Sequence, residues 1–316
     1  VRDILRDARF LLFGCWKRTK PVISFFSAMI HDPLNGELVV RHDFSNLRGF
    51  FAHTVRSSDT PALFLGTHLD SHPEFTFEKL RAMHDFAADQ FRDSSLFSLD
   101  GKELLATCEG YEKNSFIQSI QKLSKSAKKW FLIGGMPIKV SSSKLVNRSI
   151  LINKSGEIVK TYDKMHMFDV VLSSTEQYQE SEKYLPGQEL AIADLPWGKL
   201  GMSICYDLRF PKMYRKMAKL GCIFLSVPSA FTKTTGEKHW HTLLQARAIE
   251  NFSYVFAPAQ TGTHFNKRQT FGHSLIISPD GAILAEKKNG TGFIMAEIDS
   301  NLPAILRQKI PSLNLD

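Results

Sequence analysis

The chain has 316 residues, of which 43% are hydrophobic and 23% charged, the composition of an ordinary globular protein with a full core. The net charge of +8 would allow a nucleic-acid partner. However, the basic residues are scattered and form no run interleaved with aromatics, so we expect a solvated basic surface and no nucleic-acid partner. No stretch approaches the roughly 20 apolar residues of a membrane-spanning helix, so we expect no membrane partner.

The four cysteines, Cys15, Cys108, Cys205 and Cys222, form no CxxC pair and lie in apolar stretches. This spacing argues against a disulfide framework and a zinc ribbon, and it favours a reducing compartment. The apolar run at residues 10–15 is too short for a secretory signal. We therefore expect a soluble cytoplasmic protein, with no cofactor.

Residues 1–75 are the least legible part of the chain. Segments 37–41 and 62–65 have the composition of strands, and the second is followed by GTHLDSHP, which places His68 and Asp70 two residues apart. Such a pair can share a metal ion. The strings VRHDFSNLRG and PALFLGTHLDS resemble the opening of the zinc-dependent aminoacylase and allantoate-amidohydrolase type peptidases. No further ligands of that family are recognisable, so we prefer an ordinary polar strand end and expect no metal site.

The rest of the chain mixes helical and strand-like patterns without repeats. Apolar spacing predicts amphipathic helices at 75–90 and around 116–129, a helix from Pro211 to a C-cap at Gly221, and another at 240–251. The expected strands are 95–99, 130–133, 148–152, 157–162, 191–195, 200–204, 222–227, 253–257, 274–278 and 293–298. The strands at 148–152 and 157–162 form a hairpin with the turn NKSG between them. This pattern predicts a layered α/β domain in which helices cover large sheets.

Cys205 stands at the end of a buried strand, on the turn into the helix that begins at Pro211. Such a turn lifts the sulfur out of the sheet, where backbone N–H groups can stabilise an oxyanion. A thiol is mostly protonated at neutral pH, so catalysis requires a base or a nearby cation. Histidines lie downstream at positions 239, 241, 264 and 273, but no spacing singles one out. Lys164 is the other candidate, because it follows a strand and precedes the apolar MHMF.

Five strings in sequence order resemble the signatures of the nitrilase superfamily of carbon–nitrogen hydrolases. They are YDKMHMFDV, YQESEKYLPG, LPWGKLGMSICYDLRFP, PSAFTKTTGEKHWHTLLQARAIEN and AQTGTHFNKRQTFGHSLIISPDG. The resemblance implies a four-layer α-β-β-α sandwich, a Glu–Lys–Cys triad and pairing into homodimers. By motif, it assigns the nucleophile to Cys205, the lysine to Lys164 and a supporting carboxylate to Glu180.

The implied activity is that of an amidase. Cys205 attacks a linear amide to form a thioester, Lys164 and the Tyr206 backbone N–H hold the oxyanion, and ammonia leaves. The last string resembles that of deaminated-glutathione amidases and related bacterial amidases, whose substrates are small ω-amides. Four basic residues are available for an anionic group of the substrate: Arg209, Arg247, His264 and Arg268.

The N-terminus departs from the family pattern, in which a strand ending in Pro-Glu supplies the general base. The nearest equivalent is the strand before Asp100, with Glu103, Glu109 and Glu112 as alternatives. We therefore expect an atypical segment at 1–75, a nitrilase-like domain at 76–316, and Asp100 or another carboxylate as the base. The alternative is a catalytically impaired member that is retained for binding or assembly.

Overall fold

The computed structural model describes residues 22–26, 63–65, 110–111, 114–263, 268–289 and 293–315. Several expectations lie outside these ranges: the helix at 75–90, the strands at 37–41 and 95–99, the pair His68 and Asp70, the four candidate bases, and His264. The strand expected at 62–65 is present as β2.

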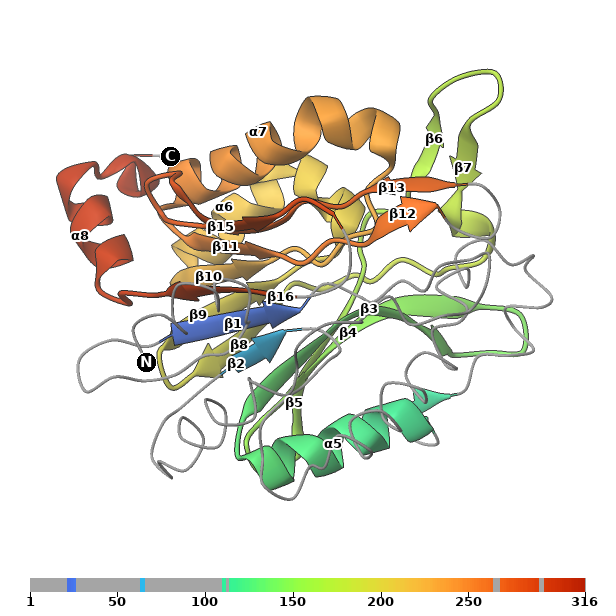
Figure 1. Ribbon diagram of the computed structural model, residues 1–316, viewed down its shortest axis with the longest axis horizontal. Helices are drawn as coiled ribbons and strands as arrows, with labels where there is room; N and C mark the ends of the chain where they lie inside the picture. Colours follow the sequence, from blue (N-terminus) through green and yellow to red (C-terminus); the bar gives the residue numbers. More distant parts are fainter. Residues whose placement is uncertain are drawn as a thin grey trace.

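Two six-stranded sheets stack on each other between outer helices, which gives four layers (Figure 1). The first sheet has the order β16-β1-β2-β3-β4-β5, with β16 Phe293–Glu297, β1 Val22–Phe26, β2 Leu63–Leu65, β3 Trp130–Lys139, β4 Leu145–Ile152 and β5 Ile158–Asp163. The second has the order β15-β14-β11-β10-β9-β8, with β15 Ile283–Lys287, β14 Ser274–Ile277, β11 Tyr254–Ala257, β10 Cys222–Ser226, β9 Gly198–Met202 and β8 Ala191–Leu195. The expected α-β-β-α sandwich is confirmed.

Helix α5, Ser115–Ala127, covers the outer face of the first sheet (Figure 1). Its N-terminus is capped by Asn114, whose side chain accepts a hydrogen bond from the Ile117 N–H at 3.0 Å. The apolar positions that predicted this helix, such as Phe116 and Leu123, are buried. The helix ends at Lys128, which adopts a left-handed backbone conformation.

Helices α6, Pro211–Lys219, and α7, Lys233–Asn251, cover the second sheet. Helix α6 begins and ends as its proline and glycine predict. Helix α7 begins seven residues before the expected Trp240, because Thr232 caps it and its first two turns are polar. No helix in the described ranges is long and apolar enough to cross a membrane.

Besides β1 and β15, several short elements have no counterpart among the predicted helices and strands. They are the hairpin of β6 Asp169–Val171 and β7 Gln177–Gln179, the hairpin of β12 Thr261–Thr263 and β13 Gln269–Phe271, the helix α8 Leu302–Lys309, and several single 3₁₀ turns. The two hairpins lie close together at one end of the molecule (Figure 1). Each strand of these hairpins has three residues, which is too short to show an alternation of apolar and polar residues in the sequence.

Candidate active site

A cavity of about 370 Å³ opens where three parallel strands end. Strands β9, β10 and β11 run parallel to one another, so the segments that follow them meet at the same edge of the sheet. These segments contribute Cys205 after β9, Ser229 after β10 and Gln260 after β11 to the cavity wall. The β5–β6 connection supplies Lys164 from the first sheet, so the cavity lies between the two sheets.

Cys205 is held on a sharp turn between β9 and α6. It opens the 3₁₀ helix η4, Cys205–Arg209, and has φ of 50°, in the left-handed region that residues other than glycine seldom adopt. Its N–H donates to the Pro228 carbonyl at 2.9 Å, which fixes the turn against the neighbouring strand end. The residue is partly exposed to the cavity, whereas Cys222 is buried. The expected strand-to-helix placement of Cys205 is confirmed.

The buried carboxylate of Asp207 holds this turn in place through hydrogen bonds. Its Oδ2 accepts from the Ile204 N–H at 2.8 Å and from the Tyr162 hydroxyl at 2.6 Å. Its Oδ1 accepts from the His166 N–H at 3.1 Å and lies 2.7 Å from His166 Nδ1. Asp207 therefore connects the turn that carries Cys205 to the segment that carries Lys164. Neither Asp207 nor Tyr162 was singled out from the sequence, although Asp207 stands within the ICYD string.

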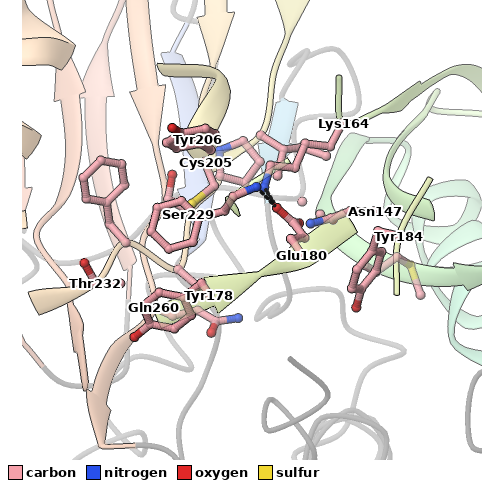
Figure 2. A pocket seen from close by; sticks show the side chains of 18 of the residues that line it. Asn147, Lys164, Tyr178, Glu180, Tyr184, Cys205, Tyr206, Ser229, Thr232 and Gln260 are labelled. Atoms are coloured by element: carbon pink, nitrogen blue, oxygen red, sulfur yellow. Dashed lines mark hydrogen bonds and ion pairs between the residues drawn. The ribbon is translucent and has the colours of Figure 1, made fainter. Parts of the chain in front are cut away.

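Lys164 and Glu180 form a buried ion pair in the wall of the cavity that Cys205 also lines (Figure 2). Their side chains are 3% and 11% exposed, so both charges are largely removed from water. Glu180 also accepts from the Phe168 N–H at 2.7 Å, and the Lys164 N–H donates to the Asn147 carbonyl at 2.9 Å. The desolvated lysine expected from the MHMF sequence is thus present, and its partner is Glu180.

Tyr206 is the second residue of η4 and lines the cavity next to Cys205. The N–H of Tyr206 belongs to the opening turn of this helix, where no intrahelical acceptor is available to it. Its ring packs edge-on against Phe168 and Phe210, with ring centres 5.0 and 5.4 Å apart. These ring contacts hold Tyr206 in place next to Cys205 in the chain.

Of the three candidate anion-binding residues that the structure describes, one lines the cavity and two do not. Arg247 is buried and donates to the Leu208 carbonyl and to Glu250, so its role is structural. Arg209 lies over the rings of Tyr206 and Phe231 and does not line the cavity. Arg268 does line it, with its guanidinium over the Tyr178 ring and one N–H on the Ala230 carbonyl.

The cavity wall has neither a histidine nor an aspartate among the residues that the structure describes. His239, His241 and His273 do not line the cavity, and His264, the fourth candidate for a Cys–His pair, lies outside the described residues. Glu180 and Glu182 are the carboxylates that line the described part of the cavity. Asp100 and its three alternatives lie outside the described residues, and the identity of the general base stays a prediction.

The carbon–nitrogen hydrolase family matches residues 97–307 of the chain. The deaminated glutathione amidase of Dictyostelium discoideum is 42% identical over 208 residues, which cover 64% of this chain and 72% of that protein. The crystal structure of the Caenorhabditis elegans NitFhit protein superposes with a TM-score of 0.67 at 27% identity, over 97% of this chain and 66% of that one. Saccharomyces cerevisiae Nit3, a member of branch 10 of the nitrilase superfamily, gives 0.63 at 25% identity, over 93% and 95%.

The sandwich and the cysteine cavity define a hydrolase of the nitrilase fold. The chain belongs to the carbon–nitrogen hydrolase family, within the nitrilase superfamily. It is an enzyme of the amidase type. The resemblance stated from the five sequence strings is confirmed.

Proposed function

We propose that the chain hydrolyses a small ω-amide through a thioester on Cys205 and releases ammonia. This proposal rests on one observation: Cys205 and the Lys164–Glu180 ion pair line the same cavity. The hydrogen bonds of Asp207 connect the segment that carries Cys205 to the segment that carries Lys164. A partly exposed cysteine on a strained turn, beside a desolvated cation, is suited to nucleophilic catalysis.

The first half of the reaction forms the acyl-enzyme. Cys205 Sγ attacks the carbonyl carbon while its proton passes to a carboxylate, for which Asp100 is the first candidate. The carbonyl oxygen becomes an oxyanion that accepts hydrogen bonds from the Lys164 ammonium and the Tyr206 N–H. When the tetrahedral intermediate collapses, the C–N bond breaks and the nitrogen takes the proton and leaves as ammonia.

The second half of the reaction regenerates the enzyme. Water attacks the thioester carbonyl, loses a proton to the same carboxylate, and forms a second oxyanion at the same donors. Breaking the C–S bond releases the carboxylic acid and returns the proton to Cys205. Glu180 keeps Lys164 in place throughout, because an ammonium in this buried position requires a counter-charge.

The substrate class rests on Arg268 and on the relatives. Arg268 lines the cavity and can bind a carboxylate in addition to its bond to the Ala230 carbonyl. The Dictyostelium discoideum relative is a deaminated glutathione amidase. We therefore propose an ω-amide that carries a carboxylate at its far end, such as an α-keto-acid ω-amide or deaminated glutathione. Homodimer formation, a cytoplasmic location and the division at residue 75 remain proposals from the sequence.

Ammonia release from an α-keto-acid ω-amide and from a neutral primary amide of similar length tests the proposal. Deaminated glutathione has a substituted amide nitrogen, so its hydrolysis should release the dipeptide amine in place of ammonia. Cys205→Ala should abolish release from every amide, whereas Cys222→Ala is the matched control and should retain it, because Cys222 is buried away from the cavity. Activity of the Cys205→Ala variant equal to that of the native chain would refute the thioester mechanism. A folded native chain that hydrolyses none of the three amides would favour the impaired-member alternative.

A further inference from the structure

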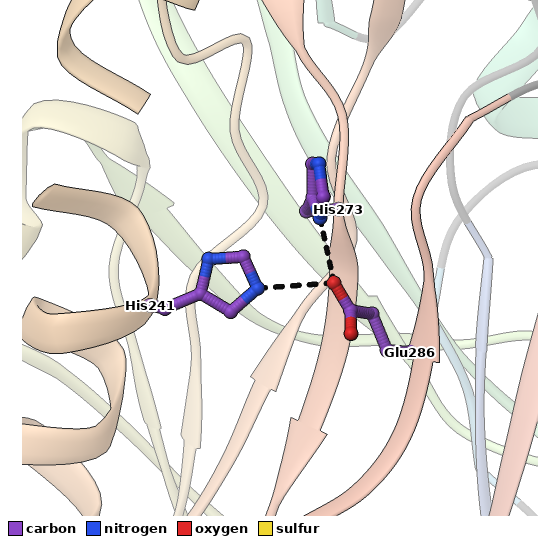
Figure 3. Close-up of side chains that lie close together, drawn as sticks. All are labelled: His241, His273 and Glu286. Atoms are coloured by element: carbon purple, nitrogen blue, oxygen red, sulfur yellow. Dashed lines mark hydrogen bonds and ion pairs between the residues drawn. The ribbon is translucent and has the colours of Figure 1, made fainter. Parts of the chain in front are cut away.

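Two histidines and one glutamate from three separate elements meet on the outer side of the second sheet, away from the cavity (Figure 3). His241 lies on α7, His273 lies in the turn before β14, and Glu286 lies on β15. Glu286 Oε1 is 3.0 Å from His241 Nε2 and 2.6 Å from His273 Nδ1. All three ligand atoms lie within 4.8 Å of one another.

We propose that His241, His273 and Glu286 bind a divalent transition-metal ion of the zinc type. In zinc proteins, nitrogen and oxygen ligands lie about 2.0 to 2.2 Å from the metal, which places tetrahedral ligands roughly 3.3 Å apart. The distance from His241 Nε2 to Glu286 Oε1, 3.0 Å, is close to that spacing, and the distance from His273 Nδ1 to Glu286 Oε1, 2.6 Å, is about 0.7 Å shorter. Small side-chain rotations would therefore open room for the ion without backbone movement.

The donor set indicates the class of metal. Two imidazoles and one carboxylate suit zinc, cobalt and nickel, whereas calcium and magnesium prefer sites made of oxygen alone. The three side chains are 32%, 18% and 22% exposed for His241, His273 and Glu286. Water can therefore reach the site and complete the coordination shell.

His273 is held in place by contacts that do not involve Glu286. Its backbone has φ of 58°, its N–H donates to the Lys288 carbonyl at 3.0 Å, and its carbonyl accepts from Trp240 Nε1 at 2.8 Å. Its ring stacks on Phe271 with ring centres 4.1 Å apart. A strained backbone that several contacts maintain is typical of functional positions, and it preorganises this ligand.

The ion would be bound partly by α7, the helix that also contributes Thr235 to the wall of the catalytic cavity. It would connect α7 to β15, the edge strand of the second sheet. Trp240 precedes His241 on α7 and packs on Phe231, which lines the cavity. The site would therefore stabilise the chain by clamping helix to sheet, and it takes no part in the amide chemistry.

Titration of the metal-free chain with Zn²⁺ and Co²⁺ tests this proposal without reference to activity. We expect one equivalent of Zn²⁺ to bind and to raise the melting temperature, an effect that a chelator reverses. Bound Co²⁺ should show the spectrum of nitrogen and oxygen ligation without a thiolate charge-transfer band. His241→Ala and Glu286→Gln should each weaken Zn²⁺ binding by at least about tenfold.

His239→Ala is the matched control, because His239 lies on the same helix two residues away and outside the cluster. This variant should bind Zn²⁺ as the native chain does. Glu286→Gln keeps the size of the side chain, so a folded Glu286→Gln variant reports on ligation even if His241→Ala unfolds. Absence of stoichiometric binding, binding unaltered in Glu286→Gln, or a cobalt spectrum of thiolate ligation would each overturn the proposal.

Discussion

The Tyr162 hydroxyl donates a 2.6 Å hydrogen bond to the buried carboxylate of Asp207, across the interface between the two sheets. Burial, and then the neighbouring Asp207 charge, raise the pKa of Tyr162 far above its ordinary value, so the hydroxyl stays protonated and donates. Asp207 lies two residues after Cys205, and Tyr162 lies two residues before Lys164. This bond therefore sets the position of the nucleophile relative to its cation.

Asp207→Ala should both destabilise the fold and reduce catalysis. The substitution removes the acceptor for the Ile204 and His166 N–H groups as well as for Tyr162. Loss of such a buried charged network costs about 3 to 5 kcal/mol of unfolding free energy. Urea unfolding measures this loss, and an unfolding free energy equal to that of the native chain would contradict the anchoring role.

The Tyr162→Phe variant distinguishes an effect on the alignment of Cys205 with Lys164 from an effect on the stability of the fold. It removes the donor to Asp207 and the acceptor of the Met165 N–H, and it leaves the other bonds of Asp207 in place. We therefore expect a loss of about 1 to 3 kcal/mol in stability. The kcat for amide hydrolysis should fall while KM changes little, because only the alignment of Cys205 with Lys164 is disturbed. An equal rise in KM with unchanged kcat would indicate that Tyr162 affects substrate binding instead.

For the Lys164–Glu180 ion pair, we expect a double variant to recover stability without recovering activity. Glu180→Gln leaves the Lys164 ammonium buried without a counter-charge and should cost about 3 kcal/mol. Lys164→Met with Glu180→Gln removes both charges and should recover part of that stability. The double variant should nevertheless remain inactive, because the oxyanion lacks its cation. Recovery of activity together with stability would contradict a catalytic role for Lys164.

Stability should fall at alkaline pH because of Cys222. Burial raises the pKa of this thiol to about 12, so the folded chain keeps a proton that the unfolded chain releases above about pH 9. The unfolded state binds fewer protons in this window, so the unfolding free energy falls as pH rises from 9 towards 12. Between pH 8 and pH 10.5, Cys222→Ala should lose about 1 to 2 kcal/mol less than the native chain. Parallel losses in the two proteins would rule out this contribution.

Arg268→Ala should impair binding of an anionic substrate. Removing the guanidinium from the cavity should raise KM for a carboxylate-bearing ω-amide by roughly tenfold or more, the equivalent of one charged hydrogen bond. The KM for a neutral amide of similar length should change far less. Arg209→Ala is the control, because Arg209 does not line the cavity. Equal effects on the two amides would assign Arg268 to the structure of the cavity wall.

Much of the sandwich could be predicted because its strands are apolar and well bounded. The strand β8 was predicted with its observed bounds, Ala191–Leu195, and α6 was predicted from Pro211 and Gly221. The polar start of α7 and the short hairpins could not be predicted, because tertiary contacts define them. For example, Gly236 on α7 packs so closely on Phe271 that an added Cβ would lie 2.3 Å from it.

The sequence predicted the reactive residues of the site but not the buried residues that hold them in position. Cys205 and Lys164 could be singled out because each follows a strand and each lies in a family-like string. Asp207 could not, because an aspartate in an apolar string becomes informative only when its partners Tyr162, Ile204 and His166 are known. The three residues of the proposed metal site are likewise 32 and 13 positions apart along the chain and converge only in the fold.

Acid-quenched mass spectrometry of the native chain during turnover detects a thioester on Cys205 itself. With a primary ω-amide that carries a carboxylate, we expect an acyl adduct on the peptide that contains Cys205, with the mass of the substrate less ammonia. Peptide mapping is necessary because Cys15 and Cys108 are also present in the chain. The adduct should be absent from Cys205→Ala. Rapid ammonia release by the Cys205→Ala variant, or an adduct on another residue in the native chain, would contradict the thioester mechanism.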